Sequence, residues 1–137
     1  MYRVNNLGKQ YKDVWALKGV SFSLPNVGLI AIKGKSGSGK STLLNLLSLL
    51  ERPTEGTIEF EGNDILKFND KKRSEFLSST TSFVFQHFNL IDESTVLENV
   101  EMPLLLRGEK KKTIRIRALS LLEKYGITYL KDKKVSV

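Results

Sequence analysis

The chain has 137 residues, 40% of them hydrophobic, and a formal net charge of +7 at pH 7. This length suits one domain with a real core, and no run of eighteen apolar residues indicates a membrane-spanning helix. It contains no cysteine, which excludes disulfides and thiolate metal sites, and its N-terminus lacks the apolar run of a secretory signal, so a cytosolic polypeptide is expected.

The positive charge lies at one end of the chain. Residues 1–106 carry twelve basic and twelve acidic side chains, whereas residues 107–137 carry ten and three. We interpret the lysines at 110–112 and 131–134 as a solvated helical face, with contact to membrane headgroups or to the cytoplasmic loops of a membrane partner as the alternative.

The first predicted elements surround a glycine-rich stretch. Residues 20–24 alternate between apolar and polar side chains, as a half-buried strand does. The short apolar run at 27–32 does not alternate, which predicts a strand covered on both faces within a parallel sheet. After the glycines, residues 41–50 are apolar almost all round and predict a buried helix that ends before Pro53.

The middle of the chain predicts two short strands and a weak helix. Residues 57–61 alternate cleanly and run into a Gly-Asn-Asp turn, which is typical of an antiparallel strand. Residues 67–78 are polar and weakly helical. Residues 82–85 predict another short strand.

Two helices are predicted near the C-terminal end. Residues 95–106 favour a helix interrupted at Pro103, and residues 113–125 favour an amphipathic helix with Gly126 as its C-cap. The apolar stripe expected on the second helix consists of Ile114, Ala118, Leu121, Leu122 and Tyr125.

Residues 34–41 match the P-loop pattern of glycine, four residues, glycine, lysine and then serine or threonine. Such a loop turns consecutive N–H groups inward around phosphates and adds the partial positive charge of a helix N-terminus. We expect Lys40 to reach the β- and γ-phosphates, Ser41 to hold Mg²⁺, and the amides of residues 37–42 to hold the β-phosphate of ATP. A glycine turn that merely caps a helix is the alternative. The expected loop contacts are Gly34, Lys35, Ser36, Gly37, Ser38, Gly39, Lys40, Ser41 and Thr42.

Beyond this loop, the sequence resembles ATP-binding cassette (ABC) ATPases over essentially its whole length. The features that carry the resemblance are Tyr11 upstream of residues 16–22, the P-loop continued by Leu43-Leu44, residues 53–58, Phe83-Val84-Phe85-Gln86, and residues 95–100. The resemblance implies that Tyr11 stacks on adenine and that Gln86 faces Mg²⁺ and the attacking water, which makes Lys40 and Gln86 the catalytic candidates. Tyr11 as a packing aromatic and Gln86 as a strand-end polar residue are the alternatives.

Within the family, residues 85–90 and 97–104 look most like the branch that serves macrolide and antimicrobial-peptide exporters and lipoprotein-release systems. The implied fold is an α/β P-loop NTPase core with an N-terminal antiparallel β subdomain over residues 1–86. Residues 87–137 then form the exit of the Q-loop and the first part of the helical subdomain.

Several parts of the family pattern are missing from the sequence. There is no apolar strand that ends in Asp-Glu (Walker B), no Leu-Ser-Gly-Gly-Gln signature, and no histidine beyond His87, which we interpret as structural. The chain is therefore expected to be a truncated, incomplete cassette, and as an isolated fragment to be marginal, oligomeric or strand-swapped.

The resemblance implies an ATP-binding subunit of an ABC transporter that uses ATP and Mg²⁺. Its implied partners are a second nucleotide-binding domain and a transmembrane permease at the inner face of the cell membrane, whereas nucleic acid is not expected and the transported substrate is not encoded here. Two alternatives are a small P-loop kinase that uses Arg107, Arg115 and Arg117, and a basic nucleic-acid-binding module at residues 107–137.

Overall fold

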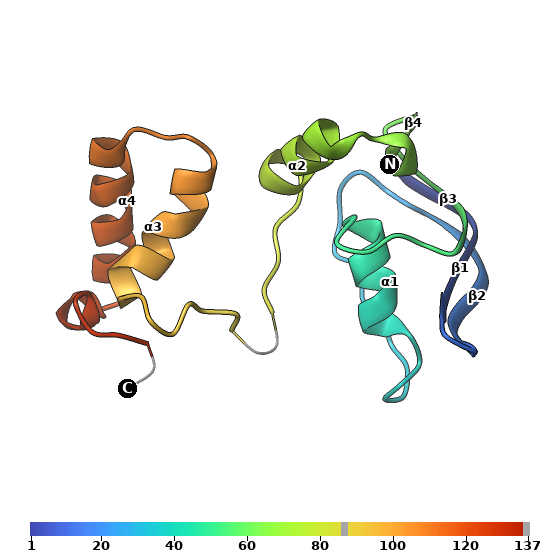
Figure 1. Cartoon of the computed structure of the whole chain (residues 1–137), viewed down its shortest axis with the longest axis horizontal. Helices are drawn as coiled ribbons and strands as arrows, with labels where there is room; N and C mark the ends of the chain where they lie inside the picture. The colour runs from blue at the N-terminus through green and yellow to red at the C-terminus, as the bar shows by residue number, and fades with distance from the viewer. Residues whose placement is uncertain (86–87, 136–137) are drawn as a thin grey trace. The chain divides into compact units, whose positions relative to one another are not determined.

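The computed structural model describes residues 1–85 and 88–135, and it contains two compact units, Met1–Ser82 and Phe83–Val137 (Figure 1). Each unit has a hydrophobic core of its own. The boundary predicted between residues 86 and 87 falls outside the described residues, so it stays a prediction.

The first unit is built on a four-stranded antiparallel sheet. β1 (Tyr2–Tyr11) lies between β2 (Val14–Leu24) and β3 (Glu55–Phe60), and the short β4 (Asn63–Asp64) pairs with β3. A two-residue turn joins β1 to β2, with Lys12 in the left-handed region at φ 52°. The predicted N-terminal antiparallel subdomain is therefore confirmed, and both strands predicted from alternation lie in it.

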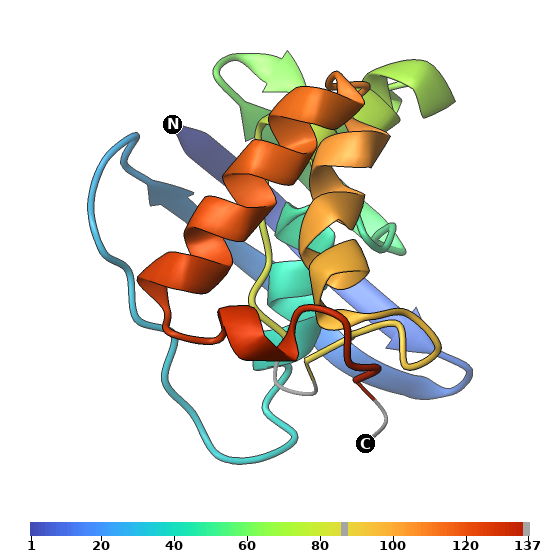
Figure 2. The ribbon, with the colours of Figure 1, turned by 90° about the vertical axis from the view of Figure 1, so that its left-hand side faces the viewer.

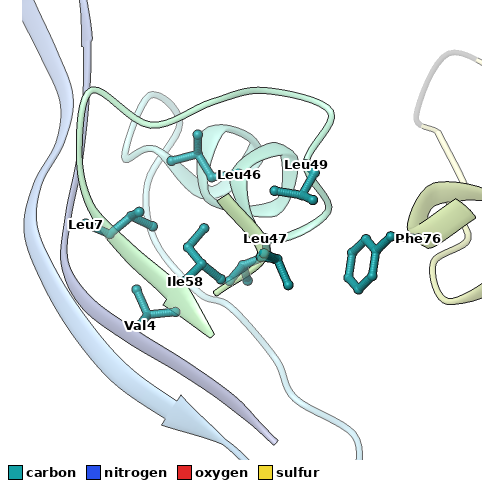
Figure 3. Close-up of a cluster of buried hydrophobic side chains, with 8 residues drawn as sticks. Val4, Leu7, Leu46, Leu47, Leu49, Ile58 and Phe76 are labelled. Carbon is teal, nitrogen blue, oxygen red and sulfur yellow. The ribbon is translucent and has the colours of Figure 1, made fainter. Parts of the chain in front are cut away.

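The core of this unit joins the sheet to α1 (Lys40–Leu47) and to a later helix (Figure 3). The helix predicted over residues 41–50 is shorter than expected, because Leu49 has a left-handed backbone at φ 60° that cannot continue it. Leu44 and Leu50 are exposed, so the helix is not buried all round as predicted. The buried cluster consists of Val4, Leu7, Leu46, Leu47, Leu49, Ile58, Ile65 and Phe76.

Residues 27–32, which were predicted to be a buried strand, form no strand in the described part of the chain. Val27 and Leu29 are 88% and 99% exposed, and Ile30 and Ile32 are exposed as well. A strand needs a hydrogen-bonded neighbour, and none of the strands in the described residues pairs with this segment. The prediction of a strand covered on both faces is wrong for this structure.

The first unit ends with η1 (Ile65–Lys67) and α2 (Asp70–Ser79). Arg73 of α2 donates from Nε and Nη2 to the carbonyl oxygen of Leu49, at 2.9 and 2.7 Å. These two bonds satisfy an acceptor just beyond the end of α1, where a helix leaves its carbonyl groups without partners. The weak helix predicted over residues 67–78 is confirmed, with a slightly later start.

Residues 82–85, also predicted to be a strand, pair with nothing among the described residues. Val84 is fully exposed, while the rings of Phe83 and Phe85 stack on one another with their centroids 5.4 Å apart. The short apolar run is present, but it makes no strand because no neighbour among the described residues supplies the hydrogen bonds.

The second unit is a helical hairpin. α3 (Val96–Leu106) and α4 (Lys111–Lys124) lie side by side, and η2 (Thr128–Leu130) follows them (Figure 2). Their shared core consists of Leu97, Ala118 and Leu122. Both helices were predicted. No helix in the described ranges is long and apolar enough to span a bilayer.

Two details of these helices differ from expectation. Pro103 does not interrupt α3, which runs through it to Leu106, so the lost N–H donor of the proline does not end the helix. On α4, the predicted stripe is too wide: Ile114, Ala118 and Leu122 are buried, whereas Leu121 and Tyr125 are 44% and 70% exposed. Packing against α3 alone covers only a narrow stripe of α4.

Candidate nucleotide-binding site

The glycine-rich loop leads directly into the N-terminus of α1, as the sequence predicted. Gly39 is the N-cap with a left-handed backbone at φ 85°, and Lys40 is the first helical residue. No side chain caps the helix and no acidic residue lies in its first turn. The first amides of α1 and the positive end of its dipole are therefore available to an anion.

Lys40 folds back across the loop. Its Nζ donates to the carbonyl oxygens of Gly34 and Lys35, at 3.0 and 2.7 Å, and lies 3.4 Å from Oγ of Ser38. An ammonium group has three donors, so these contacts use the full set and hold the charge at the centre of the loop. A phosphate oxygen that enters here meets a positive charge already in position.

Two glycines of the loop leave no room for a side chain. A Cβ on Gly39 would lie 2.6 Å from the carbonyl oxygen of Ala16 in β2, so only glycine lets the loop pack this closely against the sheet. A Cβ on Gly34 would lie 2.5 Å from Oγ of Ser38. The pattern glycines therefore allow close packing as well as the turn itself.

The side chains around the loop are open to solvent. Residues 35–38 and Ser41 are exposed, while Thr42 is half-buried. The described residues contain no group of three or more His, Cys, Asp or Glu side chains that could hold a metal ion. The hydroxyl of Ser41 lies beside the phosphate cradle. A single protein ligand suits Mg²⁺, because this ion takes most of its ligands from phosphate and water.

Tyr11 lies at the end of β1 beside the same helix. Its hydroxyl donates to Oε2 of Glu51 at 2.6 Å, and the Thr42 side chain in the first turn of α1 lies close enough to affect the pKa of the phenol. The bond to Glu51, with a smaller effect of burial, holds the pKa of the Tyr11 phenol above its ordinary value, and Thr42 opposes this shift. The structure thus brings the predicted base-stacking residue next to the predicted phosphate loop.

Glu51 and Lys9 complete this group, and sequence reasoning missed both. Nζ of Lys9 lies 3.1 Å from Oε1 of Glu51, donates to the carbonyl oxygen of Arg52 at 2.8 Å, and lies over the Tyr11 ring at 5.1 Å from its centroid. The Tyr11 bond first, and Lys9 after it, hold the pKa of Glu51 below its ordinary value, against the effect of burial. The sequence carries no pattern that marks these two residues.

The remaining candidates lie elsewhere or outside the described residues. Gln86 and His87 fall outside them, so their predicted roles stay predictions. In the basic segment, Arg115 pairs with Glu101, and Arg117 with Glu109. Part of the excess charge is therefore neutralised locally.

A glycine loop that ends at an uncapped helix, with the following lysine folded back over it, defines the P-loop class of nucleotide-binding proteins. The family model for the ABC transporter family matches residues 17–137. The chain belongs to the ABC transporter family.

Relatives and solved structures agree with this assignment. The chain is 42% identical over 137 residues to the uncharacterized ABC transporter ATP-binding protein YvrO of Bacillus subtilis, covering 97% of this chain and 58% of that protein. It is 44% identical over 125 residues to the lipoprotein-releasing system ATP-binding protein LolD of Legionella pneumophila, covering 88% and 55%. The dimeric post-hydrolysis structure of the ATP-binding cassette MJ0796, bound to ADP and Pi, superposes with a TM-score of 0.87 at 34% identity.

These comparisons place the chain with cassettes of the LolD and YvrO type, and they confirm the predicted fold class. The match to MJ0796 covers 98% of this chain and 62% of that one. The chain therefore spans about three-fifths of the length of the relatives it matches.

Proposed function

We propose that the whole protein is the ATP-binding subunit of an ABC transporter, and that it couples ATP binding and hydrolysis to export or extraction of a substrate. In this proposal the present chain supplies the phosphate cradle, with Tyr11 as the support for the base. The observation that carries the proposal is the position of Lys40, whose ammonium group lies at the carbonyl groups of Gly34 and Lys35 where α1 begins.

This geometry supports the proposed binding of a triphosphate. Phosphate oxygens replace the loop carbonyl groups as partners of Lys40, and charge-assisted bonds to phosphate are stronger than the bonds they replace. The free amides at the start of α1 supply further donors. The residues proposed to contact ATP in this loop are Gly34, Lys35, Ser36, Gly37, Ser38, Gly39, Lys40, Ser41 and Thr42.

Mg²⁺ is proposed to bind beside the same loop. The hydroxyl of Ser41 is its ligand from the described residues, and Gln86 is proposed as a second contact from the family resemblance. When bound, the ion neutralises charge that develops on the phosphate oxygens during transfer. Ser41 lies in the first turn of α1, which fixes the position of its hydroxyl beside the loop.

The partners are proposed from the related structures. Two structures of MJ0796 are dimeric, and one of them is bound to ADP and Pi. By similarity, a second nucleotide-binding domain pairs with this one. A transmembrane permease holds the assembly at the inner face of the cell membrane.

The test is titration of the chain with Mg-ATP by calorimetry. Lys40→Ala is expected to weaken binding by about a hundredfold, because a hydrogen-bonded charge in the cradle is worth about 2–3 kcal/mol. Lys71→Ala removes the same charge from an exposed position on α2 and is expected to leave the affinity unchanged. A Lys40→Ala variant that binds Mg-ATP as tightly as wild type would contradict the proposal.

The alternatives are set aside on specific grounds. Membership of the ABC transporter family argues against a small P-loop kinase. A nucleic-acid-binding module would need its basic side chains for phosphate contacts, whereas Arg115 and Arg117 are already paired with acidic side chains. We expect no salt-dependent binding of a generic DNA duplex in the same titration format.

A further inference from the structure

Two charged side chains, Glu51 and Lys9, hold the Tyr11 ring in place, and neither of them belongs to the phosphate loop. Glu51 accepts from the Tyr11 hydroxyl at 2.6 Å with one carboxylate oxygen and pairs with Lys9 at 3.1 Å with the other. We infer that Glu51 is a positioning residue for the nucleobase, which acts by fixing Tyr11 as a stacking platform. This inference rests on the proposed function, since it concerns the base of the same nucleotide.

The Tyr11 side chain needs a hydrogen bond to hold its ring in one orientation. Tyr11 is 44% exposed at the end of a strand, so no hydrophobic core fixes its side-chain torsions. A free ring must be ordered when a base stacks on it, and that ordering weakens binding. A short hydrogen bond to a carboxylate removes much of this cost before the nucleotide arrives.

Lys9 determines which side of the ring a base can use. Its Nζ lies over the ring, 5.1 Å from the centroid, and is held there by Glu51 and by the carbonyl oxygen of Arg52. The ammonium group therefore takes one face of Tyr11 and leaves the opposite face for the base. Stacking on this face involves no hydrogen-bond readout, so we expect purine triphosphates to bind alike.

The Tyr11 platform is also connected to α1 through Glu51. Glu51 contributes from beyond the last turn, where its own backbone N–H donates to the carbonyl oxygen of Asn45 at 3.1 Å. The helix that carries the phosphate cradle thereby also sets the position of the base platform.

The experiment compares Mg-ATP with inorganic tripolyphosphate, which has the phosphates but no base. For the wild-type chain, ATP should bind at least about tenfold more tightly, as expected for one stacked base. Glu51→Gln and Tyr11→Phe should each lose about three- to tenfold in ATP affinity and nothing in tripolyphosphate affinity. Tyr11→Ala should remove the whole difference between the two ligands.

A double variant and a matched control complete the test. If Glu51 acts through the Tyr11 hydroxyl, Glu51→Gln added to Tyr11→Phe should cost nothing more. The control is Glu59→Gln, which removes a partly exposed carboxylate of β3 that pairs with Arg3 of β1. It should change neither affinity.

The possible outcomes distinguish failure of the positioning role of Glu51 from failure of nucleotide binding by the phosphate loop. If wild type binds ATP and tripolyphosphate equally, or if Glu51→Gln weakens both ligands alike, the positioning role is overturned while the phosphate cradle stands. If wild type binds neither ligand, the proposed function and the positioning role both fail.

Discussion

At the level of single residues, the loop depends on two glycines whose backbones share a left-handed conformation but whose surroundings differ. Gly37 has φ 76°, and a methyl group added to its Cα would meet nothing within 4 Å. At Gly39, with φ 85°, the same methyl group would lie 2.6 Å from the carbonyl oxygen of Ala16. The first position requires glycine only for conformation, and the second also requires it for space.

This difference gives a matched pair of variants. Gly37→Ala should lower the free energy of unfolding of the first unit by about 1 kcal/mol, the usual cost of a left-handed non-glycine residue. Gly39→Ala should lower it by clearly more, because the loop must also move away from a backbone oxygen of β2 that cannot rotate aside. Chemical denaturation followed by circular dichroism measures both. Equal losses for the two variants would show that the packing against Ala16 contributes nothing.

The residue-level prediction of the site was good where a local pattern exists and failed where side chains meet across the fold. The P-loop spacing located the cradle and the start of α1 because the pattern is contiguous. The bond between Tyr11 and Glu51 joins residues 40 positions apart, and the bond between Arg73 and Leu49 joins residues 24 apart. Neither pair has a spacing that any local rule recognises.

At the level of elements, the same division appears between helices and strands. The helices were predicted close to their observed bounds, because helical hydrogen bonds and periodicity are local. The strands expected at 27–32 and 82–85 are absent from the described structure, because a strand is stable only beside a neighbour that the local pattern does not contain.

The start of α3 shows how local sequence determines an element. Thr95 accepts from the backbone N–H of Glu98 at 3.2 Å, and Glu98 returns a carboxylate oxygen to the backbone N–H of Thr95 at 2.7 Å. This reciprocal capping box satisfies two donors that the helix leaves free. It fixes where α3 begins.

Removing the cap should loosen this helix. Thr95→Ala is expected to cost about 1 kcal/mol and to speed amide hydrogen exchange along α3. Thr113→Ala, an exposed threonine inside α4, is the control and should slow exchange slightly or leave it unchanged, since alanine is the better helix former. A Thr95→Ala variant with unaltered protection in α3 would mean that the cap does not stabilise the helix.

The cap also predicts a pH dependence. The backbone bond from Thr95, followed by its side-chain bond, holds the pKa of Glu98 below the ordinary value of 4.5. A carboxyl group with a lowered pKa in the folded state stabilises that state above its unfolded pKa, and the contribution is lost as the pH falls through the folded value. The exchange difference between wild type and Thr95→Ala should therefore be constant near neutral pH and shrink below about pH 4.

At the level of the whole chain, apolar surface is distributed unevenly. The first unit buries its core between the sheet, α1 and α2, yet the segment before the phosphate loop leaves Val27, Leu29, Ile30 and Ile32 exposed. Four exposed apolar side chains lie within six residues, in a segment that pairs with no strand among the described residues. Such a segment is a template for association with another chain.

We therefore expect the chain to self-associate, with its weight-average mass in sedimentation equilibrium rising as concentration increases. Leu29→Lys places a charge at a position that is 99% exposed, so it should leave the fold intact and shift the chain towards monomer. Val14→Lys makes the same change at an isolated valine, 69% exposed beside the β1–β2 turn, and should leave association as it is in wild type. A wild-type chain that stays monomeric across the concentration range, or equal effects of the two lysines, would show that residues 27–32 do not drive association.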